Sequence, residues 1–87
     1  MANYEKTFGL LLSEFSDEDI ELNGGQDIIG DFRYFTVKGC IDLYQSNLTH
    51  KWDIFVRDEG VELTDGQKAL LYRIGTVTNG KGKKVQL

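Results

Sequence analysis

The chain has 87 residues with ten bases and fourteen acids, a formal net charge of −4, which suits one small domain over residues 1–87. The acidic balance argues against nucleic-acid binding through overall positive charge, and no apolar run approaches the ~20 residues that cross a bilayer. One cysteine excludes an internal disulfide framework, and the N-terminal residues lack a signal-peptide pattern, so we expect a cytoplasmic protein.

The first segment predicts an amphipathic helix that Asn3 caps and that fades near Ser16. Its apolar residues fall at helical spacing: Tyr4, Phe8, Leu11, Leu12 and Phe15. Beyond it, Ile20 and Leu22 alternate with acids and precede Asn23-Gly24, the strongest short hairpin signal. We therefore predict a short strand that turns there into residues 27–29.

Residues 31–45 are rich in aromatic and β-branched side chains and predict β-structure. Its apolar face consists of Phe35, Val37, Ile41 and Leu43. Gly39 is compatible with a bulge in one long strand or with a two-residue turn at Lys38-Gly39, and we favour the bulge. Residues 46–49 have turn composition, and residues 51–57 predict a strand with Trp52, Ile54 and Val56 on one face.

The second helix has the clearest boundaries in the chain. Thr64 and Gln67 have the spacing of a capping box, Leu70, Leu71 and Ile74 form an apolar stripe, and Gly75 is a natural C-terminal cap. The tail after it is compatible with a hairpin about Asn79-Gly80 or with a flexible basic end. This order predicts an α+β domain, with an antiparallel sheet of three to four strands and both helices on one face.

The candidate chemical groups favour structural over catalytic roles. The chain contains the residue types of a catalytic triad: Cys40 as nucleophile, His50 as base and Asp42 or Asp53 as the orienting acid. Such a triad is defined by its geometry, and the spacing of these residues in the sequence does not indicate one. Asp19-x-Glu21-x-Asn23-Gly24 resembles the start of a calcium loop, yet the twelfth position is Gly30 where a glutamate is required. We therefore expect no enzymatic activity, no metal, no cofactor and no small-molecule substrate.

Charge is distributed unevenly along the chain. Residues 14–31 hold seven acids and no base: Glu14, Asp17, Glu18, Asp19, Glu21, Asp27 and Asp31. Residues 66–87 hold five bases and no acid: Lys68, Arg73, Lys81, Lys83 and Lys84. Such asymmetry bears on partners rather than on fold. The two segments either neutralise one another or serve separate contacts.

Phe32, Tyr34 and Tyr44 are predicted to lie on the sheet face opposite Phe35, and exposed rings there suit base stacking or a protein interface. The alternative is a second small apolar cluster under residues 17–30 or under the tail.

These patterns favour a non-catalytic binding protein: a small acidic inhibitor or modulator of a nucleic-acid-binding protein, of the type that phages and mobile elements encode. In this hypothesis the seven acids contact a basic partner. The alternative is a small nucleic-acid-binding domain that uses Lys81, Lys83 and Lys84 for phosphates and Tyr34 and Tyr44 for stacking. A homodimer formed by pairing of sheet edges is compatible with both.

Overall fold

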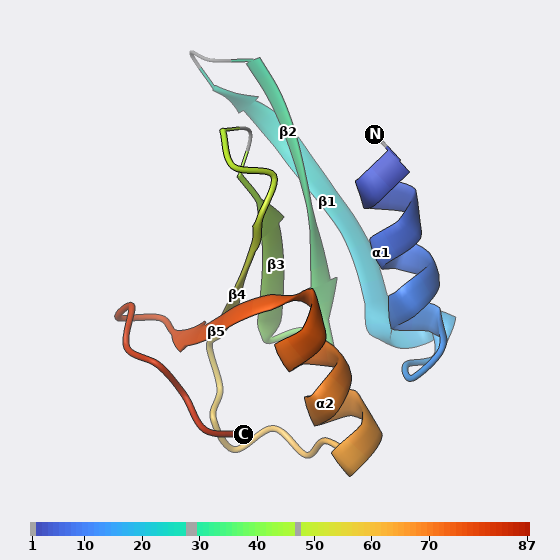
Figure 1. Cartoon of the computed structure of the whole chain (residues 1–87), viewed down its shortest axis with the longest axis vertical. Helices are drawn as coiled ribbons and strands as arrows, with labels where there is room; N and C mark the ends of the chain where they lie inside the picture. Colours follow the sequence, from blue (N-terminus) through green and yellow to red (C-terminus); the bar gives the residue numbers. More distant parts are fainter. Residues whose placement is uncertain (1, 28–29, 47) are drawn as a thin grey trace.

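In the part of the chain that the structure describes, five strands form one sheet, and two α-helices pack against one of its faces (Figure 1). The computed structural model describes the backbone of residues 2–27, 30–46 and 48–87 and the side chains of residues 4–24, 33–46 and 48–87. The elements are α1 (Ala2–Leu12), the 3-10 helix η1 (Asp17–Asp19), β1 (Ile20–Asp27), β2 (Gly30–Val37), β3 (Ile41–Gln45), β4 (Trp52–Val56), α2 (Asp65–Ile74) and β5 (Gly75–Asn79). No helix in these ranges is both long and apolar enough to cross a membrane. The predicted α+β class is confirmed.

The sheet has one strand more than predicted, and one of its pairs is parallel. The strand order is β1-β2-β3-β4-β5, with an antiparallel meander from β1 to β4 and a parallel β4–β5 pair. The prediction of three to four antiparallel strands is wrong in this detail, because α2 carries the chain back and lets β5 enter beside β4 in the same direction. Gly75 permits this approach, since a Cβ there would meet the carbonyl of Trp52.

The connection between β2 and β3 is a turn, so the favoured long strand with a bulge is wrong, and the alternative of a two-residue turn at Lys38-Gly39 is right in place but one residue too short. Lys38 and Gly39 have φ of 53° and 71°, and the Cys40 N–H donates to the Val37 carbonyl over 3.2 Å. Cys40 adds a third residue to the connection. Val37 therefore pairs with Ile41, and both side chains keep to the same face.

The β1–β2 hairpin does not turn at Asn23-Gly24 as predicted. Asn23 pairs with Tyr34, and β1 continues to Asp27 opposite Gly30. The long pairing with β2 thus overrides the local turn preference, and the connection falls on residues 28–29, which lie outside the described residues, as does Asn47 in the predicted 46–49 turn. Since β3 pairs only with 34–37 of β2, the far half of the hairpin projects beyond the sheet (Figure 1).

The core lies between the helices and the sheet face that they cover, called the covered face below. The predicted strand residues Phe35, Val37, Ile41 and Leu43 are all fully buried, together with Leu11 and Leu71 from the two helices. Tyr4 stacks on Phe35 with ring centroids 4.6 Å apart. Leu12 departs from the predicted stripe, since 42% of it is exposed.

The boundaries of α2 agree with the capping prediction. The Gln67 N–H donates to Thr64 Oγ1 over 3.1 Å, and the Thr64 N–H donates to Gln67 Oε1 over 2.9 Å. Gln67 Nε2 also donates to the Glu14 carbonyl over 2.9 Å, which fixes the end of α1 against the start of α2. Helix α1 ends at Leu12, earlier than predicted.

The C-terminal tail folds back on β5 as the hairpin interpretation predicts. The Asn79 N–H donates to the Lys83 carbonyl over 2.7 Å, and the Val85 N–H donates to the Val77 carbonyl over 3.3 Å. The Val85 side chain joins the core. The Tyr72 hydroxyl, which donates to the Val85 carbonyl and accepts from the Leu87 N–H, holds the last residues in place.

Candidate partner-binding surface

The structure divides the seven predicted acids between separate places. Asp17, Glu18 and Asp19 form η1, and Glu21 follows near the start of β1. Asp27 lies at the other end of β1, and Asp31 pairs with Gln26 in the register there. Eight extended residues span roughly 25 Å, so the two groups do not form one patch. The side chains of Asp27 and Asp31 lie outside the described residues.

Glu14 belongs to neither group. Its carbonyl accepts the Gln67 hydrogen bond, and its carboxylate lies over Gly66, where an added Cβ would meet it. Its position beside the first turn of α2 therefore gives Glu14 a role in joining the two helices.

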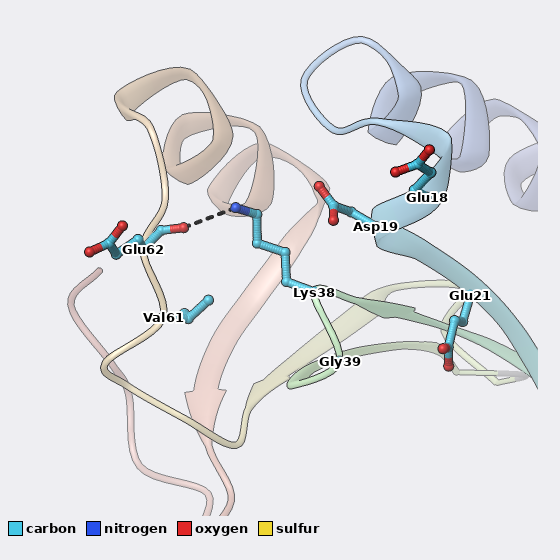
Figure 2. A pocket seen from close by; sticks show the side chains of 7 residues that line it. All are labelled: Glu18, Asp19, Glu21, Lys38, Gly39, Val61 and Glu62. Carbon is cyan, nitrogen blue, oxygen red and sulfur yellow. Dashed lines mark hydrogen bonds between the residues drawn. The ribbon is translucent and has the colours of Figure 1, made fainter.

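Glu18, Asp19 and Glu21 line a hollow of about 370 Å³, called the acidic hollow below (Figure 2). Its other lining residues are Lys38, Gly39, Val61 and Glu62. Four acidic residues from η1, β1 and the 57–64 loop thus line one hollow together with one lysine. Because acids from three segments line the same hollow, the negative potential there is higher than any one segment would produce alone.

Glu62 is a site residue that the sequence interpretation missed. It lies far along the chain from Glu21, so no local pattern connects them. A signal was present, since residues 58–65 hold four acids and no base. What was missing was the topology that brings this loop to the β2–β3 turn.

Lys38 is fixed at the centre of the acidic hollow by hydrogen bonds to the backbone. Its N–H donates to the Asp19 carbonyl over 2.8 Å, and its Nζ donates to the Glu62 carbonyl over 3.2 Å (Figure 2). Within the described residues, the ion pair that lies within 4.0 Å is Arg57–Asp42, which is outside this hollow. The four carboxylates therefore keep their charge available to a ligand.

The opposite face of the sheet, called the open face, carries the predicted aromatic residues. Tyr34 and Tyr44 pair across β2 and β3 and stack with ring centroids 4.5 Å apart. Phe55 from β4 packs edge-on against Tyr44 at 5.8 Å, an aromatic neighbour that the prediction left out. The side chain of Phe32 lies outside the described residues.

A chain of hydrogen bonds crosses the open face beside these rings. Asn23 Nδ2 donates to Thr36 Oγ1 over 2.8 Å, and Thr36 Oγ1 donates to Asp42 Oδ1 over 2.9 Å. Arg57 donates to both oxygens of Asp42, at 2.9 and 3.2 Å. The hydrogen bond and charge of Asp42 raise the pKa of the Arg57 guanidinium. Asp42 is thus paired within the protein.

A second hollow of about 540 Å³ lies over this network. It shares Glu21 and Gly39 with the acidic hollow, so the two adjoin at the β2–β3 turn. A ligand that reaches the acidic hollow can therefore extend onto the open face without leaving the protein surface.

The residues of the catalytic triad weighed above are not brought together. Cys40 precedes β3, whereas His50 follows it in the turn before β4. Burial, followed by the charge of Asp58, raises the pKa of the Cys40 thiol, which disfavours the thiolate. The calcium pattern falls on η1 and strand β1 instead of a single loop, and no group of three or more His, Cys, Asp or Glu in the described residues is placed to hold a metal ion.

The basic residues of the alternative site also lie apart from its aromatic residues. Lys81, Lys83 and Lys84 follow β5 and fold along its outer side, while Tyr34 and Tyr44 belong to β2 and β3. The intervening strands separate the two groups by at least two strand spacings, roughly 10 Å. The acidic hollow is not lined by Lys81, Lys83 or Lys84, whereas Gln86 and Leu87 at the end of the tail line a neighbouring hollow with Val61 and Glu62.

Comparisons with protein-family models, with curated proteins and with solved structures find no match for this chain.

Proposed function

We propose that this chain is a non-catalytic binding protein whose acidic hollow receives a basic segment of a protein partner. The observation that carries the proposal is that Glu18, Asp19, Glu21 and Glu62 line one hollow with Lys38, whose ammonium donates to a backbone carbonyl. The carboxylates draw a cationic partner, and Lys38 restricts which arrangements of positive charge fit. Electrostatic complementarity of this kind mainly raises the association rate and the specificity.

The partner class that fits this surface best is a nucleic-acid-binding protein. Such proteins present rows of lysine and arginine that neutralise phosphates. Carboxylates spaced along η1 and β1 compete for the same cationic groups. When this chain occupies the basic surface of its partner, nucleic acid is excluded from that surface. The chain therefore acts as a stoichiometric inhibitor or modulator, as accessory proteins of phages and mobile elements do.

A matched pair of charge variants tests the proposal. Glu18→Gln combined with Glu21→Gln removes two charges from the acidic hollow. Glu5→Gln combined with Asp53→Asn removes two exposed charges elsewhere, so the net charge changes equally. Wild-type protein and both variants serve as baits in extract of the native host, and the association rate of each captured, purified protein is then measured against ionic strength.

We expect the hollow variant to associate about tenfold or more slowly at low salt, and the difference to shrink as salt rises. The control variant should follow the wild type. Equal association rates for the two variants would contradict the proposal, because net charge alone would then account for the binding.

The alternative, a nucleic-acid-binding domain, has one observation in its favour, the Tyr34–Tyr44 stack on the open face. Gel shifts with short single-stranded RNA and DNA at low salt test it. Binding that disappears with Lys83→Ala and Lys84→Ala combined would favour this alternative. We expect no shift, because the acidic hollow adjoins the tyrosine pair and the lysines lie at the other edge of the sheet.

A further inference from the structure

The two edges of the sheet are finished differently. Along β5, the tail supplies a partial sixth strand, in which Val85 N–H donates to the Val77 carbonyl and Lys84 bridges Thr78. Along the outer side of β1, no element of the described chain adds a strand. A bare strand edge is a template for pairing with another extended segment.

The pairing pattern shows which backbone groups point outward from β1. The Lys38 N–H donates to the Asp19 carbonyl, and hydrogen-bonded pairs recur at alternate positions of the antiparallel register. Glu21 and Asn23 therefore direct their backbone groups to β2. Leu22 and Gly24 direct theirs away from the sheet, and within the described residues nothing hydrogen-bonds to them.

The side chains along this edge specify the residues that an added strand would carry. On the open face the edge presents Glu21 and Asn23, next to the acidic hollow. On the covered face it presents Ile20 and Leu22, and 61% of Leu22 is exposed. A strand laid along β1 places alternate side chains beside these two surfaces.

We propose that β1 pairs with an extended segment of the partner in which basic and apolar residues alternate. The basic side chains lie beside Glu21, the apolar ones pack on Leu22, and the backbone bonds to Leu22 and Gly24. This inference rests on the proposed function, because the paired strand belongs to the same basic segment of the partner that the acidic hollow receives. A second copy of the chain is disfavoured as the occupant, because its β1 carries Glu21 and would bring negative charge towards the acidic hollow.

The experiment uses a synthetic peptide of about ten residues, in which lysine and valine alternate, and a control peptide with the same composition in scrambled order. Amide hydrogen exchange is followed by NMR in the wild-type protein. The alternating peptide should slow exchange at Leu22 and Gly24 and leave Glu21 and Asn23, already bonded to β2, unchanged. The scrambled peptide should slow neither.

Two substitutions at one position separate backbone pairing from side-chain contact. Leu22→Pro removes an outward N–H that β2 does not use, as edge strands tolerate. Leu22→Thr keeps the N–H and the strand conformation. We expect Leu22→Pro to lower the affinity for the alternating peptide about tenfold and Leu22→Thr to lower it far less. If Leu22→Pro does not fold, amide hydrogen exchange at Leu22 and Gly24 of the wild-type protein decides by itself whether the peptide pairs with β1.

The outcomes separate the two proposals. In one outcome, Glu18→Gln with Glu21→Gln lowers the affinity for both peptides equally, and Leu22→Pro lowers the affinity for neither. The acidic hollow then binds basic segments, but the strand addition is wrong. If the amides are protected and the charge variant changes nothing, the strand addition stands and the proposed function is wrong. Lack of protection by the alternating peptide, or a wild-type dimer that Leu22→Pro converts to monomer, overturns the strand addition.

Discussion

On the covered face of the sheet, Phe35, Ile41 and Leu43 are fully buried, whereas on the open face Tyr34, Asp42 and Tyr44 alternate with them along the same strands and are only partly buried. The covered face excludes water and holds the helices. The open face satisfies its polar groups within the sheet and adjoins the acidic hollow. Neighbouring residues of one strand are therefore under different constraints, and substitutions on the two faces should affect different properties.

The largest effect on stability should come from the covered face. Leu71→Ala in α2 removes a fully buried side chain from the core and should lower the free energy of unfolding by ~2–5 kcal/mol. Leu12→Ala is the matched control, because 42% of that leucine is exposed, and it should cost less. Urea unfolding of both variants measures the difference. Equal losses would show that α2 does not cover this face.

A glycine at the junction of α2 and β5 should have the next largest effect. Gly75→Ala directs a methyl group at the Trp52 backbone and should cost about 1–3 kcal/mol by forcing β5 away from β4. Gly9→Ala lies inside α1 and meets no atom of the described residues within 4 Å, so it should stabilise the fold by up to ~1 kcal/mol. Thermal unfolding of the two variants shows whether each substitution lowers or raises the stability. A neutral Gly75→Ala would contradict the close parallel pairing.

Loss of the helix cap should have a smaller effect. Thr64→Ala removes the hydroxyl that accepts from the Gln67 N–H and should lower the free energy of unfolding by ~0.5–2 kcal/mol. Thr64→Ser keeps an accepting oxygen and should recover most of the loss. Denaturant titration distinguishes them, and an unrecovered serine variant would point to the lost methyl group instead of the cap.

The smallest stability effect is expected on the open face. Arg57→Ala breaks the ion pair with Asp42, but half of the arginine side chain is exposed, so the loss should stay near ~1 kcal/mol or below. High salt should reduce it further. Stability measured at low and high salt checks this. A loss as large as that of Leu71→Ala would erase the distinction between the two faces.

The sequence predicts the covered face well because apolar alternation is a local signal. Phe35, Val37 and Ile54 all keep the predicted parity, and Thr64 begins α2 where its capping pattern places it. The β1–β2 turn is not predictable in the same way, since Asn23 pairs with Tyr34 despite the strong local preference of Asn-Gly for turns. Pairing over a whole hairpin outweighs that preference.

The candidate site was only partly predictable for a related reason. Glu18, Asp19 and Glu21 are adjacent in sequence and were found by charge alone. Glu62 and Lys38 reach them through the β2–β3 turn and the 57–64 loop, contacts that depend on the finished sheet. The parallel pairing of β5 with β4 was missed likewise, because the whole of α2 separates the two strands in the sequence.

The most direct test of the central claim is an NMR map of amide shifts in the folded chain, recorded as a partner captured with the wild-type protein is added. The account predicts that the largest changes occur at Glu18, Asp19, Glu21, Lys38 and Glu62, around the acidic hollow. Changes confined to the tail lysines and to Tyr34 and Tyr44, with the acidic hollow undisturbed, would contradict it.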